Sequence, residues 1–187
     1  TGELEKTNDA YAIAKIAGIK MCESYNIQYK TNYKCLMPTN TFGPNDNYNT
    51  LNSHFLPALI KKVHDLKLNN KKELILWGNG LAKREVIYVD DLADACIFFM
   101  KKSFYGTILN IGTGKDFSIK QYAKIILNKI MPKSKIKIKY DLSKPNGTPR
   151  KVLDIKLANR YGWKPKTKLD DAITKTYLNF LENNKIV

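Results

Sequence analysis

The stretch REVIYVDDLADACIFFMKK, residues 84–102, changes its pattern of side chains partway along. Up to Val89 it is rich in β-branched and aromatic residues, which is typical of a strand. The acidic pair Asp90–Asp91 follows, and carboxylates are favoured in the first turn of a helix because of the helix dipole. The stretch therefore predicts a strand that leads directly into a helix.

The same pattern recurs on both sides of this stretch. Upstream, FLPALIKKVHDLK (55–67) predicts an amphipathic helix and ELILWGNG (73–80) a short strand closed by a glycine turn. Downstream, GTILNIGTG (106–114) predicts a strand with a Gly-rich turn, and SIKQYAKIILNKIM (118–131) predicts another amphipathic helix. Alternating strands and helices indicate an α/β architecture with a parallel sheet. The turn after Ile111 lacks the G-x-G-x-x-G spacing of a dinucleotide fingerprint, so we interpret it as a loop.

The remaining segments complete this alternation. Apolar residues at near-helical spacing predict a long helix over residues 10–29. TNYKCLMP (31–38) predicts a strand that Pro38 ends, and TNTFGPNDNYN (39–49) predicts a loop because it is dense in Gly, Pro, Asn and Asp. KIKIKYD alternates like a half-buried strand, and a last helix is expected from Asp170 to about Glu182.

Composition excludes some classes of protein. The 187 residues are 43% hydrophobic, enough for a core, and no run of 18 apolar residues predicts a membrane span. Cys22, Cys35 and Cys96 lie in apolar runs without metal-ligand spacing, which favours reduced core thiols and a cytoplasmic protein. The net charge of +15 is spread along the chain without a compact Arg-rich block, which does not favour nucleic acid as a partner. A small polyanionic ligand such as a nucleotide sugar would also suit a basic chain, and charge alone does not choose between these partners.

Tyr11 and Lys15 lie four positions apart in the first predicted helix, so their side chains share one face. Such a pair occurs by chance in many helices. It is also the spacing of a proton-transfer pair, because a lysine ammonium one turn away favours the phenolate form of the tyrosine. The spacing by itself favours the ordinary structural pair.

Several segments taken together resemble one family. YAIAKIAGIKMCESYN and MPTNTFGPNDNY are similar to the catalytic helix and the following loop of the extended short-chain dehydrogenase/reductases. The resemblance narrows to the GDP-L-fucose synthase family through four further segments: NSHFLPALIKK, LWGNGLAKREVIYVDDLADA, LNIGTG and SKPNGTPRKVLD. The resemblance implies part of a Rossmann-like parallel sheet interleaved with a smaller α/β substrate-binding domain. The family's Gly-rich phosphate loop and its catalytic cysteine have no counterpart here, so the chain resembles the C-terminal portion of such an enzyme.

The resemblance also implies a division into domains. We expect a partial NADP-binding Rossmann domain in residues 1–42, 86–111 and 153–187. A GDP-sugar-binding domain is expected in residues 43–85 and 112–152. The intact enzyme is expected to be a homodimer.

The family's functional residues map onto matching positions of this chain. The resemblance implies that Tyr11 is the general acid/base of ketone reduction, that Lys15 supports it and holds the nicotinamide ribose, and that His54 serves epimerisation. The loop formed by Pro38, Thr39, Asn40 and Thr41, together with Lys15 and His54, is expected to contact NADP(H). Substrate contacts are expected from four residues, of which Lys62 stands where the family usually has arginine and Asn146 where it has aspartate: Lys62, Trp77, Arg84 and Asn146. No residue of the sequence is expected to bind a metal.

The expected activity is 3,5-epimerisation and NADPH-dependent 4-reduction of GDP-4-keto-6-deoxy-D-mannose to GDP-L-fucose. One alternative is a reductase for another GDP-sugar, such as a 6-deoxy-heptose. Another is a non-catalytic remnant that binds nucleotide sugars or nucleic acid, and without a phosphate-cradling loop the isolated chain is expected to bind little NADPH.

Overall fold

A computed structural model describes residues 3–4, 8–49, 53–102, 104 and 106–183. The chain order of its helices and strands is α1 (Asp9–Tyr29), β1 (Cys35–Pro38), β2 (Asn40–Phe42), α2 (Phe55–Leu68), β3 (Glu73–Trp77), β4 (Lys83–Tyr88), α3 (Val89–Lys101), β5 (Ile108–Ile111), β6 (Asp116–Ser118), α4 (Ile119–Ile130), β7 (Lys137–Asp141), β8 (Arg150–Lys151), α5 (Lys156–Arg160) and α6 (Leu169–Asn183). The predicted α/β class is confirmed. None of the described helices is long and apolar enough to cross a membrane.

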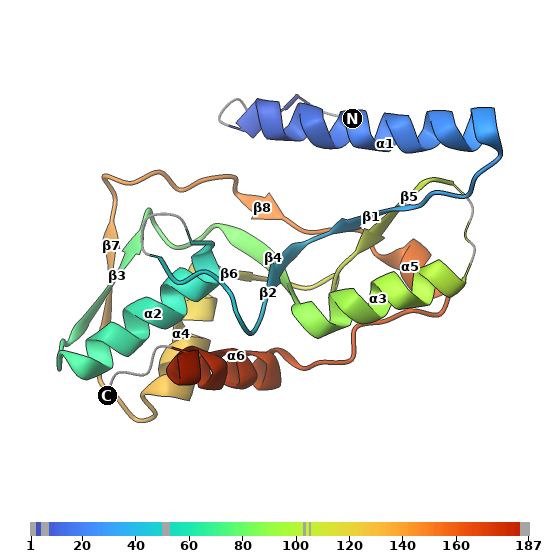
Figure 1. The fold of residues 1–187 in the computed structure, drawn as a ribbon. Coiled ribbons are helices and arrows are strands. Elements are labelled where there is room, and N and C mark those ends of the chain that lie inside the picture. The colour runs from blue at the N-terminus through green and yellow to red at the C-terminus, as the bar shows by residue number, and fades with distance from the viewer. Residues whose placement is uncertain (1–2, 5–7, 50–52, 103, 105, 184–187) are drawn as a thin grey trace.

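The strands pair mostly in parallel. β1 pairs with β5, β2 with β4, and β3 with β7, each in parallel register. β4 also pairs antiparallel with β6 and, beside it, parallel with β8. β4 is thus the strand at which β2, β6 and β8 meet, and it continues directly into α3 as the sequence predicted (Figure 1).

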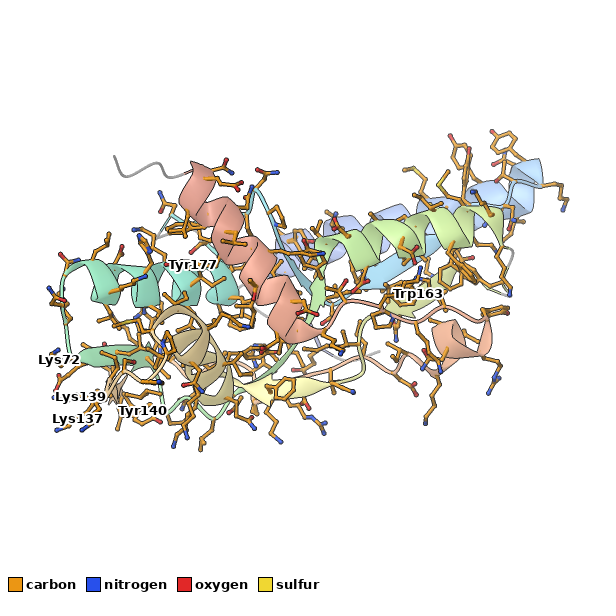
Figure 2. All side chains as sticks on the ribbon, turned by 90° about the horizontal axis from the view of Figure 1, so that it is seen from below. Lys72, Lys137, Lys139, Tyr140, Trp163 and Tyr177 are labelled. Atoms are coloured by element: carbon orange, nitrogen blue, oxygen red, sulfur yellow. The ribbon has the colours of Figure 1, made fainter. Side chains whose placement is uncertain are left out.

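Two hydrophobic clusters lie on either side of β4, because successive side chains of a strand point to opposite faces. Val86 and Tyr88 belong to the cluster that α2, α4 and α6 cover. Ile87 belongs to the second cluster, which includes Phe99 of α3 and Trp163. Figure 2 shows Trp163 beside α3 and Tyr177 on α6 near α2. The helix α6 therefore packs with α2 and α4, while the domain division expected from the sequence stays a prediction.

The capping of α4 explains where this helix begins. The Ser118 hydroxyl accepts a hydrogen bond from the Gln121 backbone N–H, and the Gln121 side chain accepts one from the Ser118 N–H. This capping box satisfies two donors that the helix itself leaves unpaired. The apolar face that follows is buried, with Tyr122, Ala123, Ile126, Leu127 and Ile130 in the first cluster.

Three expectations need correction. The predicted loop 39–49 contains a strand, because β2 pairs with β4 through residues 40–42. Two short strands, β6 and β8, and the short helix α5 were not predicted. The three thiols are free, but they are not core residues: Cys96 is exposed, and Cys22 and Cys35 are half-buried.

Candidate functional site

A cavity of about 310 Å³ lies between α2, β3, the start of α4 and the loop before β8. The four residues expected to contact substrate all line it: Lys62, Trp77, Arg84 and Asn146. They come from α2, β3, β4 and the loop that follows β7, so the fold brings together positions that are far apart in the sequence. Much of the remaining wall is apolar, including Phe55, Leu59 and Ile119. The cavity combines cationic groups and an aromatic ring with an apolar floor.

Cationic groups surround Trp77 at this cavity. The Lys62 ammonium lies 5.4 Å from the centroid of the indole ring, and the Lys144 ammonium lies 5.7 Å from it. Burial lowers the pKa of Lys62 below its usual range, because desolvation penalises the charged form. Lys144 was not singled out from the sequence, where it is one of many lysines in a polar loop. Two ammonium groups beside an exposed indole can bind an anionic ligand that carries a flat ring.

Arg84 is held by backbone carbonyls. Its Nη1 donates to the Lys83 carbonyl at 2.7 Å and to the Thr148 carbonyl at 2.6 Å. Desolvation by burial lowers the pKa of Arg84. Its own carbonyl accepts a hydrogen bond from the Tyr122 hydroxyl at 2.9 Å, which ties β4 to α4. Arg84 is thereby fixed between the strand and the 148–153 segment.

Asn146 fastens the loop after β7 to the turn after β3. Its Oδ1 accepts a hydrogen bond from the Asn79 N–H at 2.7 Å. Gly78 has a φ of +64°, and a Cβ at this position would collide with Asn146. Only glycine permits both the left-handed backbone and this close approach. The side chain expected to contact substrate therefore also closes one wall of the cavity.

The residues expected to carry the acid–base chemistry lie outside this cavity. Tyr11 and Lys15 are exposed on α1, with the Lys15 ammonium 5.3 Å from the centroid of the Tyr11 ring. The predicted sharing of one helix face is confirmed. His54 is exposed at the N-cap of α2 and makes no side-chain capping bond. Figure 1 shows α1 apart from α2, so the structure does not bring Tyr11 and His54 together.

The loop expected to contact the cofactor is tied to β4. The Thr39 hydroxyl and the Asn40 amide both donate to the Glu85 carbonyl, at 3.1 and 3.0 Å. The Thr41 hydroxyl donates to the Thr39 carbonyl at 3.3 Å, and Pro38 is exposed at the end of β1. Three of the four residues thus have side chains engaged within the protein. This leaves the exposed rim of the loop for a ligand.

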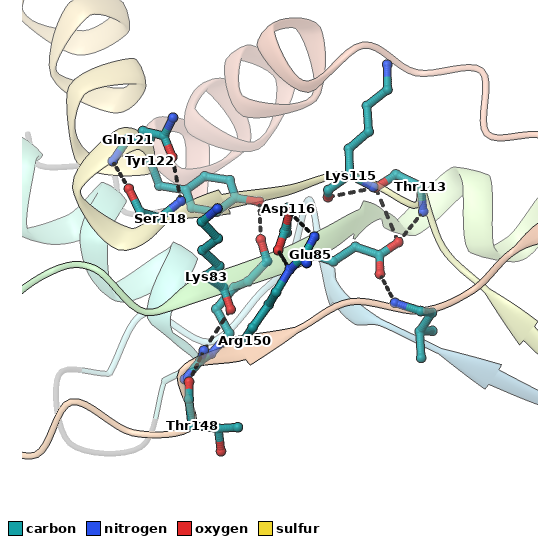
Figure 3. Close-up of polar contacts among 12 residues, drawn as sticks. Lys83, Glu85, Thr113, Lys115, Asp116, Ser118, Gln121, Tyr122, Thr148 and Arg150 are labelled. Atoms are coloured by element: carbon teal, nitrogen blue, oxygen red, sulfur yellow. Dashed lines mark hydrogen bonds and ion pairs between the residues drawn. The ribbon is translucent and has the colours of Figure 1, made fainter.

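Glu85 was missed by the sequence reasoning. Its side chain is fully buried, and its carboxylate accepts hydrogen bonds from the backbone N–H groups of Thr113, Gly114 and Leu153 (Figure 3). A charged residue inside a strand gives no sign from sequence that backbone donors will converge on it. The Gly-rich turn before β6 could have suggested an anion acceptor, since such turns expose consecutive N–H groups.

Comparisons with known proteins identify similar sequences. Residues 1–112 match the family model described as the NAD dependent epimerase/dehydratase family. The chain is 46% identical over 98% of its length to a putative GDP-L-fucose synthase 2 from Arabidopsis thaliana, covering 55% of that protein. It is 42% identical over 97% of its length to the GDP-L-fucose synthase of Escherichia coli strain K12, covering 59% of that protein. The chain thus spans little more than half the length of these curated relatives.

Solved structures show the same similarity. A GDP-L-fucose synthetase from Naegleria fowleri bound to NADP matches with a TM-score of 0.87 and 26% identity, covering all of this chain and 60% of that one. A GDP-6-OMe-4-keto-L-xylo-heptose reductase from C. jejuni matches with a TM-score of 0.85 and 34% identity, covering 98% of this chain and 63% of that one. Both similarities extend over nearly all of the chain.

Proposed function

The chain belongs to the NAD dependent epimerase/dehydratase family. On this basis we propose the reaction in which it takes part. It carries the sugar-nucleotide site and acid–base groups of an enzyme that converts GDP-4-keto-6-deoxy-D-mannose to GDP-L-fucose. The reaction combines 3,5-epimerisation with NADPH-dependent reduction of the 4-keto group. The observation that carries the proposal is the convergence of Lys62, Trp77, Arg84 and Asn146 on one cavity.

The chemistry of this cavity suits a GDP-sugar. Lys62 and Arg84 supply positive charge for the two phosphates, and partial burial strengthens such charge-assisted hydrogen bonds. Trp77 supplies a flat surface beside them. Arg84 is already oriented by two backbone carbonyls, so little side-chain entropy is lost when it binds an anion.

Reduction of a ketone requires a proton at its oxygen, and we assign this proton to Tyr11. The Lys15 ammonium stands over the Tyr11 ring, where its charge stabilises the phenolate left after the proton is given up. Epimerisation requires a proton to leave and return at the carbons beside the ketone. We assign one of these transfers to His54, which is exposed and makes no capping bond at the start of α2.

The residues that would hold NADP(H) are Lys15, His54 and the loop from Pro38 to Thr41. When bound, NADPH supplies the hydride. Lys15 is exposed and can turn from the Tyr11 ring toward a ribose hydroxyl, and the rim of the loop is exposed at Pro38 and Asn40. The rim of the loop suits a nucleotide, Lys15 and His54 belong to helices that lie apart, and Thr39 and Asn40 also keep the loop in register with β4.

A second GDP-sugar is an alternative substrate. The similarity to a heptose reductase supports a GDP-4-keto-heptose as the alternative, because the residues of the cavity address the nucleotide rather than the sugar. Supplying each 4-keto sugar with NADPH and identifying the product separates the two. If an intact parent or a reconstituted complex binds GDP but turns over neither sugar, the chain serves as a binding protein.

Binding of GDP tests the nucleotide site directly. We expect calorimetric titration of the chain with GDP to show binding, and Arg84→Met to weaken it about 10- to 100-fold, the range for a hydrogen bond to a charged group. Lys137→Met is the matched control, because Lys137 is exposed on β7 and does not line the cavity (Figure 2). Equal losses of GDP affinity in both variants would mean that the effect comes from net charge alone, and the assignment of Arg84 to the nucleotide site would be wrong.

A further inference from the structure

Glu85 lies where three segments meet. Its Oε1 accepts hydrogen bonds from the N–H groups of Thr113 and Gly114, at 2.5 and 2.7 Å, and its Oε2 accepts one from the Leu153 N–H at 2.7 Å. The Thr113 hydroxyl lies 3.3 Å from Oε1. The turn before β6 and the segment after β8 are thus both tied to β4 through a single carboxylate (Figure 3).

This carboxylate is held by backbone groups. Glu85 is 0% exposed, and within the described part of the chain the ion pairs do not include it. Burying an ionised carboxylate is costly unless strong donors satisfy it. The three N–H groups do so, and a Cβ on Gly112 would collide with Oε1. The turn is therefore built closely around this side chain.

The Leu153 bond controls the segment that holds Arg84. Leu153 follows β8, a two-residue strand that pairs with Lys83 and Arg84 of β4. Thr148, just before β8, supplies the carbonyl to which Arg84 donates. The two-residue ladder, the hydrogen bond from the Lys83 N–H to the Pro149 carbonyl and the ion pair of Arg150 with Asp116 hold the near end of this segment. The bond to Glu85 anchors its far end. Loss of the anchor would free the Thr148 carbonyl to move away from Arg84.

The backbone of Glu85 reaches the other functional segment. Its carbonyl accepts the hydrogen bonds from Thr39 and Asn40, in the loop expected to contact the cofactor. We infer that Glu85 is a positioning residue: it sets Arg84 for the nucleotide sugar through the 148–153 segment and links that site to the 39–40 loop. This inference rests on the proposed function, because it assigns Glu85 to the site that binds GDP.

Glu85→Gln is designed to break the hydrogen bond from Leu153 and to keep those from Thr113 and Gly114. The amide oxygen of glutamine can still accept from Thr113 and Gly114, but its NH₂ group cannot accept from Leu153. We expect the Kd for GDP to rise about tenfold while the far-UV circular dichroism is retained. The expected rise is small when Arg84→Met is already present, because Glu85 acts through Arg84. Glu73→Gln is the matched control, since Glu73 is an exposed partner of Lys139.

Hydrogen exchange gives a readout that a purely structural residue would not move. In the unaltered chain, saturation with GDP should slow exchange of the Thr113, Gly114 and Leu153 amides, which lie beyond the cavity wall. If Glu85→Gln does not fold, Gly112→Ala displaces Oε1 without removing the carboxylate and should weaken GDP binding likewise.

The outcomes separate the two proposals. If GDP binds and Arg84→Met weakens it, but Glu85→Gln keeps the affinity within about twofold, the inference falls and the proposed function stands. Unchanged exchange of all three amides on GDP saturation also overturns the inference. Failure of the unaltered chain to bind GDP overturns the nucleotide site itself.

Discussion

The helices α1 and α4 differ both in how their apolar residues are distributed and in their surroundings. In α4, a capping box fixes the first turn and the apolar face is buried in the core. In α1, Asn8 makes no side-chain capping bond and no residue of the helix is buried. Ile16 is 44% exposed, whereas Ile126 of α4 is 0% exposed. The apolar residues of α4 therefore gather on a face that covers a core, whereas those of α1 are not gathered on one face and include exposed residues such as Ile16.

Because of this difference, we expect α4 to contribute mainly to the stability of the fold and α1 mainly to the reaction. Most of the stability of a helix in a protein comes from burial of its apolar face, so α4 contributes to the core far more than α1 does. The residues assigned to proton transfer, Tyr11 and Lys15, lie on α1. Substitutions on α1 should therefore alter activity with little change in stability, and substitutions on α4 should do the reverse.

The largest expected effect is on the reaction, from Tyr11→Phe. This change removes the proton donor for the ketone oxygen, and general acid–base groups typically contribute about 10²- to 10⁴-fold to rate. Tyr11 is 59% exposed, so the thermal midpoint should stay within about a degree or two of the unaltered protein. The measurement is NADPH oxidation with the GDP-4-keto sugar in an intact parent enzyme or a reconstituted complex that supplies the phosphate-cradling loop, beside a thermal melt of the same sample.

His54→Gln is the companion variant, because it should impair a different step. Uptake of solvent deuterium at C3 and C5 should slow, while reduction of the sugar that is not epimerised continues. If the turnover rate of Tyr11→Phe stays within about tenfold of the unaltered enzyme, a barrier difference of roughly 1.4 kcal/mol, Tyr11 is not the general acid/base.

The next effect is on stability, from Ile126→Ala in α4. Ile126 is fully buried beside Tyr122 and Ile60 in the first cluster, and truncation of such a side chain leaves a cavity. We expect the free energy of unfolding to fall by about 2–5 kcal/mol in urea titration. Ile16→Ala on α1 should change it by no more than about 0.5 kcal/mol. Similar losses from both variants would mean that α1 is packed as tightly as α4.

The sequence predicted the elements whose periodicity is local. α2, α4 and α6 begin and end within a few residues of the expected positions, and β4 continues into α3 as the acidic pair at residues 90 and 91 indicated. β2 was missed because residues 39–49 carry the composition of a loop, while pairing with β4 is a long-range contact that overrides it.

The residues of the candidate site were also predicted only in part. The resemblance named four of the residues that line the cavity, but it could not foresee Glu85, whose partners come from the turn at residues 112–114 and from Leu153. Nor did the near-helical spacing of apolar residues reveal that α1 buries none of them. Periodicity specifies which residues share a face, whereas the neighbour that covers the face depends on the tertiary fold.

The smallest expected effect concerns His64, a titratable residue that is buried in the same part of the protein as α4. His64 lies on α2, is 5% exposed, and packs against Tyr177 and Phe180 of α6, with Nδ1 3.0 Å from the Tyr177 hydroxyl. Burial lowers the pKa of His64, and the nearby Lys61 and Lys67 lower it further, against the opposing effect of Asp65. The folded state thus favours the neutral ring more than the unfolded state does.

The sign of the pH dependence follows from this shift. As the pH falls through about 6.5, the ordinary pKa of histidine, the unfolded chain takes up a proton that the folded chain takes up only at lower pH. The contribution of His64 to stability is therefore full above pH 6.5 and is lost as the pH falls through the folded pKa, by no more than about 1.4 kcal/mol per pH unit. Urea titrations between pH 7.5 and 5 should show a shallower loss in His64→Gln than in the unaltered chain. His54→Gln is the matched control, because it removes the exposed histidine; an equal change of slope in both variants would show that burial of His64 between α2 and α6 is not the cause.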